Sequence, residues 1–493
     1  MTAGVAAGAT VNLTLVSHTN VGKTTLMRTL LRRDVGEVAD RAHVTEIAEP
    51  FVLLDTREGD VLRLWDTPGF GDSARLLRRL RNSGNPLGWL QTQWDRLTDR
   101  PFFCTQQALR NVRDESDVVL YLVNAAEDPR AAGYAAAELE ILRWIGKPVL
   151  LLLNQTGQSR GHQADAADEA KWSGQLAEYV QSRGAVTLDA FARCWVQEDR
   201  LLGEASRLVP PDKQAAFERL RAAWRKRNLD VFRDSMKAIA TQLAAAITDR
   251  EPVPEATMGS RAREFFASLK ADREAQPDPA TQAAMQRLAA RLDQGVRDST
   301  DRLIALHGLP GRAQEQILAR VSSQFDVTKP VDAVRSGVLG GMVTGALGGL
   351  AADVAAAGMT FGAGAIIGGI LGALGAGGAA QAYNLMTGEE EGRVRWSGGF
   401  IMQRTESALL RYLAVAHYGR GRGDWREGEY PAHWRVLVER ILAAHRERLD
   451  AIVLSAVDEG AEGLAGQLEA VLAEVAREIL EALYPAARSI FKA

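Results

Sequence analysis

Cysteine and excess charge are scarce in this sequence, and each scarcity argues against a class of protein. Only two of the 493 residues are cysteine, Cys104 and Cys194, which excludes a disulfide scaffold, and their spacing does not resemble a metal site. The 59 basic and 62 acidic residues leave a net charge of −3, so we expect no nucleic-acid partner. Residues 1–10 lack a basic patch followed by a long apolar core, so we expect no signal peptide and a cytoplasmic protein.

The most informative stretch lies between residues 11 and 25. An apolar run over residues 11–16 leads into a polar turn, and Gly22, Lys23 and Thr24 then open a helix predicted over residues 25–32. Backbone N–H groups in such a turn, together with the positive end of the helix, hold the phosphates of a nucleoside triphosphate. We expect Lys23 to reach the β- and γ-phosphate oxygens and the Thr24 hydroxyl to bind Mg²⁺. The predicted phosphate-binding set also includes Ser17, Asn20, Val21 and Thr25.

Ser17 is a departure from the usual phosphate-loop pattern, G-x-x-x-x-G-K-[ST]. It stands where the pattern has its first glycine. Serine is small enough for the turn but tolerates positive φ less well than glycine.

A second motif follows two further predicted strands, over residues 50–55 and 61–65. The second strand ends in Asp66, Thr67, Pro68 and Gly69. An aspartate at the carboxyl end of a strand suits a Mg²⁺ contact, and a glycine after it can approach the γ-phosphate. Thr45 lies upstream, at the spacing expected of a loop that closes over Mg²⁺. The predicted metal site therefore consists of Thr24, Thr45 and Asp66.

Phosphate loop, loop threonine and Asp-x-x-Gly, in this order and spacing, resemble the switch GTPases of the Ras-like superfamily. The segments HTNVGKTT and WDTPGFGD are most similar to those of the bacterial Era and TrmE branch. The resemblance implies GTP and GDP as ligands, Mg²⁺ as cofactor and slow hydrolysis of GTP. Lys23, Thr45 and Asn20 are the catalytic residues that it implies, and Thr45 and Gly69 would sense the γ-phosphate.

The guanine-specificity motif of this superfamily, Asn-Lys-x-Asp, reads Asn154, Gln155, Thr156 and Gly157 in this chain. In the family the aspartate accepts two hydrogen bonds from guanine, which rejects adenine. Gly157 has no side chain for this, so either another acceptor serves or base selectivity is weaker. By resemblance, Asn154 and Gln155 remain the expected base-site residues.

Catalysis also departs from the Ras pattern. Phe70 stands where Ras-type proteins use glutamine to orient the attacking water, and an apolar side chain cannot polarise water. In Era and TrmE relatives with the same departure, the asparagine ahead of Val-Gly-Lys can coordinate K⁺, which supplies positive charge at the phosphates. Asn20 occupies this position, and its alternative role is a turn asparagine hydrogen-bonded to its own backbone.

Three more apolar runs, over residues 117–124, 148–153 and 186–189, complete a doubly wound α/β GTPase domain predicted over residues 1–192. Beyond it, strand signals largely disappear and the fold is predicted to be all-α, with a helical domain over residues 193–335 and a C-terminal helical region over 389–493 that packs with it. Apolar residues at helical spacing support both, at Phe217, Leu220, Trp224, Phe232, Met236, Ile239, Leu243 and Ile247, and at Leu464, Leu468, Val471, Leu472, Val475, Ile479 and Leu483. The charges around Arg219, Arg221, Arg225, Lys226 and Arg227 are expected to form solvated faces.

The composition changes over residues 336–388, where glycine and alanine dominate and Asp353 is the only charged residue. Glycines recur every fourth residue, which places them on one helical face and predicts a helical hairpin closed by a glycine zipper. The uncharged start of its first arm, residues 336–352, would span about 26 Å as a helix, slightly less than a hydrocarbon core of about 30 Å. The hairpin either associates with a membrane or packs inside a soluble helical domain.

Two functions stay open at this point. The first is a GTPase switch coupled to a membrane-associated helical region, which places the protein in the cytoplasm and at the cytoplasmic membrane. The alternative is a recruitment module with little turnover and a soluble hairpin. Either form admits a homodimer through the GTPase domain or a membrane-protein partner. A role in RNA assembly is disfavoured, because no basic, aromatic-interleaved domain follows the GTPase.

Overall fold

The structure is a computed structural model, and the chain forms two compact units. The described residues are 8–32, 48–71, 73–83, 100–156, 162–179, 185–188, 194–253, 279–309, 383–387, 392–418, 431–456 and 460–492. The first unit comprises residues Met1–Asp230, Ala416–Asp424 and Leu480–Ala493. The second comprises Val231–Val415 and Trp425–Ile479.

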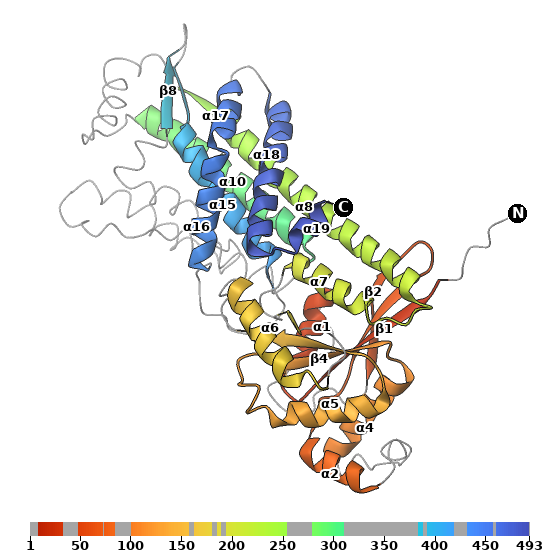
Figure 1. Cartoon of the computed structure of the whole chain (residues 1–493). Helices are drawn as coiled ribbons and strands as arrows, with labels where there is room; N and C mark the ends of the chain where they lie inside the picture. The colour runs from red at the N-terminus through yellow and green to blue at the C-terminus, as the bar shows by residue number, and fades with distance from the viewer. Residues whose placement is uncertain are drawn as a thin grey trace, which may run out of the picture. The chain divides into compact units, whose positions relative to one another are not determined.

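A six-stranded sheet organises the first unit, in the order β2-β3-β1-β4-β5-β6. Its strands are β1 (Thr10–Ser17), β2 (Glu49–Asp55), β3 (Val61–Asp66), β4 (Val118–Asn124), β5 (Val149–Asn154) and β6 (Ala185–Thr187). Strands β1, β2 and β4 are labelled in Figure 1. Only the β2–β3 pair is antiparallel, because a short turn joins these two strands, whereas helical connections separate the others. All six strands lie where the apolar runs predicted them, which confirms the α/β fold class.

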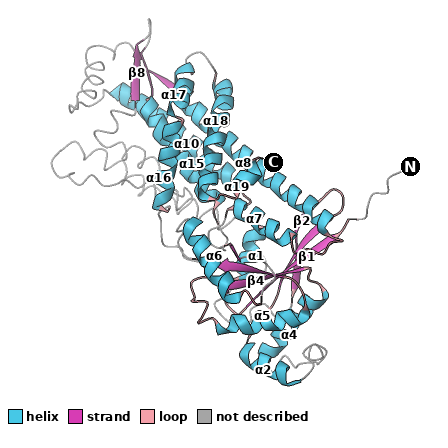
Figure 2. Cartoon of the chain, in the orientation of Figure 1, coloured by secondary structure: helices cyan, strands magenta, loops and turns pink. Residues whose placement is uncertain are grey.

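Helices cover both faces of this sheet (Figure 2). One buried cluster combines the sheet with α2 (Ser73–Ser83), α4 (Arg100–Asp114), α5 (Gly133–Ile145) and α6 (His162–Leu176). The other combines it with α1 (Lys23–Leu31), α7 (Trp195–Ser206) and α8 (Gln214–Thr248). The parallel strands β4 and β5 are apolar almost throughout because both of their faces are buried.

The first unit extends beyond the boundary predicted at residue 192. Leu201, Leu202, Phe217, Leu220 and Trp224, from α7 and α8, share one buried cluster with β1, β3 and β4. The apolar face of the sheet therefore requires these two helices as cover. Helix α8 is continuous over 35 residues and belongs to both units, with the division after Asp230.

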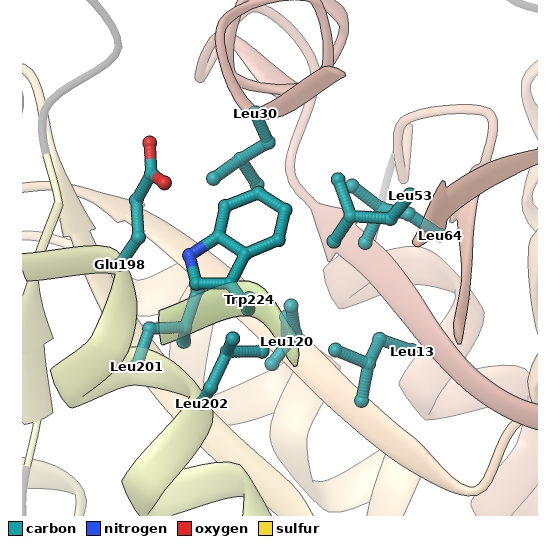
Figure 3. Close-up of a pocket in the computed structure, with 9 residues that line it drawn as sticks. All are labelled: Leu13, Leu30, Leu53, Leu64, Leu120, Glu198, Leu201, Leu202 and Trp224. Carbon is teal, nitrogen blue, oxygen red and sulfur yellow. The ribbon is translucent and has the colours of Figure 1, made fainter. Parts of the chain in front are cut away.

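A small cavity lies beneath α8, among leucines of the sheet and of the neighbouring helices (Figure 3). Figure 3 shows the Trp224 indole between Leu30 on one side and Leu201 and Leu202 on the other, with the Glu198 carboxylate directed away from the sheet leucines. The cavity has a volume of about 10 Å³, which holds at most about one water molecule. This is a packing gap in the core and too small for a ligand.

The arginines on α8 correct only part of the expectation of a solvated face: the Arg221 and Arg225 side chains are 24% and 22% exposed, whereas that of Arg219 is 44% exposed, although its guanidinium is paired. Arg219 donates to the buried Asp60 carboxylate through Nε at 2.6 Å and Nη2 at 3.0 Å. Arg221 and Arg225 both pair with the buried Asp199 of α7. The pattern of α8 does not reveal these pairs, because both acids lie on other elements. Lys226, three-quarters exposed and paired with Asp230 along the helix, does fit the expectation.

The second unit is mostly helical. Besides its parts of α8 and α18 (Ala461–Leu483), it contains α10 (Pro279–Leu306), α15 (Gly398–Ala416), α16 (Ala432–Ala444) and α17 (Arg446–Ser455). The predicted apolar stripe on α18 is buried from Leu464 to Ile479. The unit also carries a small antiparallel sheet that the sequence did not predict, in the order β7 (Arg250–Val253), β9 (Gly392–Trp396) and β8 (Tyr383–Thr387).

The chain's last helices return to the first unit. The Phe491 ring of α19 (Ala487–Phe491) meets the Trp195 ring of α7 edge-on, with centroids 5.8 Å apart. Tyr484 stacks on His417 at 5.6 Å. The first unit is thus assembled from both ends of the chain.

The predicted glycine-zipper hairpin, residues 336–388, lies outside the described residues except for Tyr383–Thr387, which form β8. In the part of the chain that the structure does describe, no helix combines the length and the apolar character needed to span a bilayer.

The Asp60 carboxyl predicts how stability responds to acid. Its hydrogen bonds from Arg219 hold its pKa below the ordinary 3.8, despite the opposing effect of burial. A depressed folded-state pKa contributes stability above the unfolded-state pKa, and this stability is lost as pH falls through the folded value. We expect Asp60→Asn to lower the melting temperature at neutral pH. Between about pH 5 and about pH 3, the melting temperature of Asp60→Asn should fall less than that of the wild type. Asp212→Asn is the control, because Asp212 is exposed, and it should respond to acid as the wild type does. An equal fall in melting temperature for Asp60→Asn and wild type would contradict the prediction.

Candidate functional site

The carboxyl ends of β1, β3, β4 and β5 place the motif residues at one edge of the first sheet. Ser17, Asp66 and Asn154 are the last residues of β1, β3 and β5. Parallel register aligns them, since Leu15 of β1 pairs with Asp66 and Asn124 of β4 pairs with Asn154. In open α/β sheets, ligands bind at this edge.

The loop between β1 and α1 has the backbone geometry that its sequence requires. Gly22 precedes α1 with φ of 95°, and Asn20 has φ of 65°, both in the left-handed region. Glycine and asparagine are the residues that adopt this region most readily. A Cβ at Gly22 would also lie 2.8 Å from Asn154 Nδ2. The turn therefore ends with the N-terminus of α1 directed at the edge of the sheet, which is an arrangement for binding anions.

Lys23 is the buried cation of this loop. Its Nζ donates to Ser17 Oγ at 3.0 Å, so the residue that replaces the usual glycine is a direct partner of the lysine. Burial lowers the pKa of Lys23, and the carboxylates of Asp66 and Glu138 oppose this shift. A cation in these surroundings is suited to bind phosphate oxygens, whose charge replaces the lost hydration.

Thr24 and Asp66 lie side by side, with Thr24 Oγ1 donating to Asp66 Oδ2 at 2.7 Å. A hydroxyl and a carboxylate are oxygen donors of the kind that Mg²⁺ takes alongside phosphate oxygens and water. Their chemistry fits the predicted metal site. Its third member, Thr45, lies outside the described residues. Among those described, no group of three or more His, Cys, Asp or Glu side chains is arranged to hold a metal.

Gly69 lies against the phosphate loop. A Cβ there would come within 3.0 Å of Thr19 Cα and 3.2 Å of Lys23 Nζ, so only glycine fits without displacing one of them. Phe70, which follows, is fully buried, and its backbone pairs with the loop: its N–H donates to Ser17 O at 3.0 Å and its carbonyl accepts from Thr19 N–H at 3.2 Å. The Phe70 ring belongs to the core and leaves no side chain there to orient a water.

Asn154 and Gln155 also contact the phosphate loop. The buried Asn154 side chain donates through Nδ2 to Val21 O at 2.7 Å, and Gln155 Nε2 donates to Asn20 O at 3.5 Å. Gln155 has φ of 57°. The end of β5 therefore braces the phosphate loop from the side where the base motif is expected. Gly157 lies outside the described residues.

Sequence reasoning missed Glu138, which the structure places beneath this site. Its carboxylate is fully buried and receives hydrogen bonds from three donors on separate segments. Glu138 lies in the stretch GYAAAELEILRWI, three residues after Ala135 and four before Leu142, which places it on the buried face of the helix. That spacing was the signal available in the sequence, but it does not identify the donors that pair with the carboxylate.

Two family models match the chain. The one described as a domain of unknown function, DUF3482, matches residues 180–468, which is more than half of the sequence. The one described as a 50S ribosome-binding GTPase matches residues 12–155. No curated protein matches the chain.

Solved structures of Era and of a bacterial dynamin pair are among those similar to this chain. Era in complex with MgGDPNP and nucleotides 1506–1542 of 16S ribosomal RNA is 16% identical with a TM-score of 0.30, and the match covers 41% of this chain but only 58% of that one. An Era variant from Aquifex aeolicus bound to GDP and AlF₄⁻ is 14% identical with a TM-score of 0.31, covering 59% and 89%. One chain of an oligomerised bacterial dynamin pair, described as sensing and tethering membranes, is 10% identical with a TM-score of 0.23, covering 98% and 73%.

Proposed function

Since the chain belongs to the DUF3482 family and carries a 50S ribosome-binding GTPase domain at its N-terminus, we propose that it is a switch that binds GTP and hydrolyses it slowly to GDP. The observation that carries the proposal is the convergence of Lys23, Thr24, Asp66 and Gly69 at one edge of the sheet. One buried cation, a pair of oxygen ligands and a glycine beside that cation meet the needs of a triphosphate.

Each of these residues has a role in the proposed site. The N–H groups at the start of α1 hold the α- and β-phosphates, and Lys23 reaches the β- and γ-phosphate oxygens. Thr24 and Asp66 would hold Mg²⁺, which neutralises charge between the phosphates. Gly69 N–H and Thr45 would respond to the γ-phosphate, while Asn154 and Gln155 would position the guanine side of the site.

Slow turnover follows from Phe70. Phosphoryl transfer relies on positioning and charge, and a glutamine that orients the water is part of this machinery in Ras-type proteins. With Phe70 buried in the core, catalysis would depend on Lys23 and on a cation near Asn20, whose side chain is exposed in the loop. The alternative, a recruitment module with little turnover, rests on the same feature.

Potassium dependence tests the hydrolytic form of the proposal. We expect GTP turnover to rise about tenfold or more when K⁺ replaces Na⁺, and this stimulation to vanish in Asn20→Ala while GTP binding persists. The measurement is phosphate release at equal ionic strength. Turnover that is equal in both salts and unchanged in Asn20→Ala would rule out the proposed potassium site. Turnover near zero in both, with tight GTP binding, would favour the recruitment module.

Helix α8 supports coupling between the nucleotide site and the helical region. Strand β3 ends at Asp66 beside Thr24, and immediately before its start Asp60 holds Arg219 of α8. Lys213, just ahead of α8, pairs with Asp117 at 2.8 Å. A nucleotide-dependent shift of β3 would therefore act on a helix that continues into the second unit.

We propose that residues 336–388 carry the effect of the switch to its target. Their low charge and glycine spacing favour association with a membrane, and a homodimer or a membrane-protein partner would serve the same end. Flotation of the protein with liposomes, with and without a non-hydrolysable GTP analogue, tests this proposal. We expect nucleotide-dependent flotation that is lost when residues 336–388 are deleted. Absence of flotation in every condition, with GTP hydrolysis intact, would direct the search to a soluble protein partner.

A further inference from the structure

Among the described residues, Glu138 is the buried carboxylate beside the site to which the proposed nucleotide chemistry gives no role. It lies on α5 with none of its surface exposed. Its Oε1 accepts from His18 Nδ1 at 2.7 Å and from Ser73 Oγ at 2.5 Å, and its Oε2 accepts from Tyr121 OH at 2.7 Å. A carboxylate is costly to bury without such partners, so these three hydrogen bonds are what keep it in the core.

Two of the three donors belong to segments that border the proposed phosphate site, and the third belongs to the sheet. His18 is the second residue of the phosphate loop, next to the Ser17 that binds Lys23. Ser73 is the first residue of α2, four positions after Gly69. Tyr121 lies on the central strand β4. One carboxylate therefore holds the phosphate loop and the segment after Gly69 against the sheet.

The surroundings of His18 fix its orientation. Its ring stacks on Tyr134 with centroids 4.5 Å apart and 25° between the planes, and Tyr134 OH donates to Glu127 Oε2 at 2.9 Å. The hydrogen bond between His18 Nδ1 and Glu138 Oε1 holds the other edge of the ring. The His18 backbone also forms a β-bridge with Phe70. The loop and the Gly69–Phe70 segment thus contact each other directly and share an anchor.

We propose that Glu138 is a positioning residue that couples the phosphate loop to the start of α2, and so determines how well the site distinguishes GTP from GDP. This inference rests on the proposed function. The α- and β-phosphates contact the phosphate loop alone, whereas the γ-phosphate also requires the segment at Gly69. Loosening the anchor at Ser73 therefore weakens binding of the triphosphate more than binding of the diphosphate.

Glu138→Gln tests the proposal, because it keeps the shape of the side chain but removes the charge and one acceptor. We expect the affinity for a non-hydrolysable GTP analogue, relative to that for GDP, to fall about tenfold, as measured with fluorescent nucleotides. Glu140→Gln is the matched control. It lies on the same helix and pairs with Arg81 of α2, but none of its hydrogen bonds or ion pairs in the described structure reaches the phosphate loop, so its ratio should stay within about twofold of wild type.

Ser73→Ala keeps the test decisive if Glu138→Gln fails to fold. It removes one donor from α2 and should shift the same ratio in the same direction, with a folded protein verified by its melting curve. A ratio unchanged in folded Glu138→Gln, or unchanged in Ser73→Ala, would overturn the inference and leave Glu138 as a core stabiliser. Wild type that binds neither nucleotide would instead overturn the proposed function itself.

Discussion

Lys23→Ala is expected to lower GTP affinity by at least about 100-fold. The lysine is the one buried cation among the described residues of the loop, and hydrogen bonds to charged groups contribute about 1.5–3 kcal/mol each. Two such bonds, to β- and γ-phosphate oxygens, account for the loss. Titration of the protein with a fluorescent GTP analogue measures it.

Lys147→Ala provides the matched control for this prediction. Lys147 also belongs to the GTPase domain and donates to Ser116 O at 2.7 Å, a carbonyl that precedes β4 at the opposite edge of the sheet from the phosphate loop. Its replacement should leave GTP affinity within about twofold. If Lys23→Ala retained wild-type affinity, the phosphates would have to bind elsewhere and the site assignment would fail.

Trp224→Ala is expected to have the largest effect on stability, about 3–5 kcal/mol. The indole is 1% exposed and packs among leucines of α1, the sheet and α7. Removing it would enlarge the existing gap beneath α8 into a cavity that the surrounding rigid sheet cannot fill. Chemical denaturation followed by circular dichroism measures the loss.

Leu454→Ala is the control for this prediction, because Leu454 on α17 is 73% exposed and should change stability by less than about 0.5 kcal/mol. A small effect of Trp224→Ala would mean that α8 is dispensable for the GTPase unit. In that case the unit could end near the predicted boundary at residue 192.

The fold of the GTPase domain could be predicted because its signals are local. Apolar runs that are buried on both faces identify β4 and β5 without knowledge of their neighbours. The proposed phosphate-binding residues could be named from the sequence for a similar reason. Gly22, Lys23 and Thr24 are consecutive, and the remaining site residues follow strands at fixed offsets.

The features that sequence reasoning missed depend on contacts between distant segments. Glu138 finds donors at positions 18, 73 and 121, and Asp60 finds Arg219 across 159 residues. The small sheet of the second unit pairs β7 with β9. Arg393 and Arg395 of β9 alternate with Val394 and Trp396, but the strand has only five residues and its partner β7 is distant in the sequence. Burial of such charges is decided by the tertiary partner, which the local sequence does not contain.

Competition between GTP and ATP for the purified wild-type protein, in the presence of Mg²⁺, shows whether this sheet edge is a guanine-nucleotide switch. We expect GTP to bind at the site of Lys23 and excess ATP to displace it poorly, with Asn154 and Gln155 on the base side. Efficient displacement by ATP would show that the altered base motif no longer selects guanine. Absence of binding by either nucleotide would contradict the assignment of this sheet edge as a nucleotide switch.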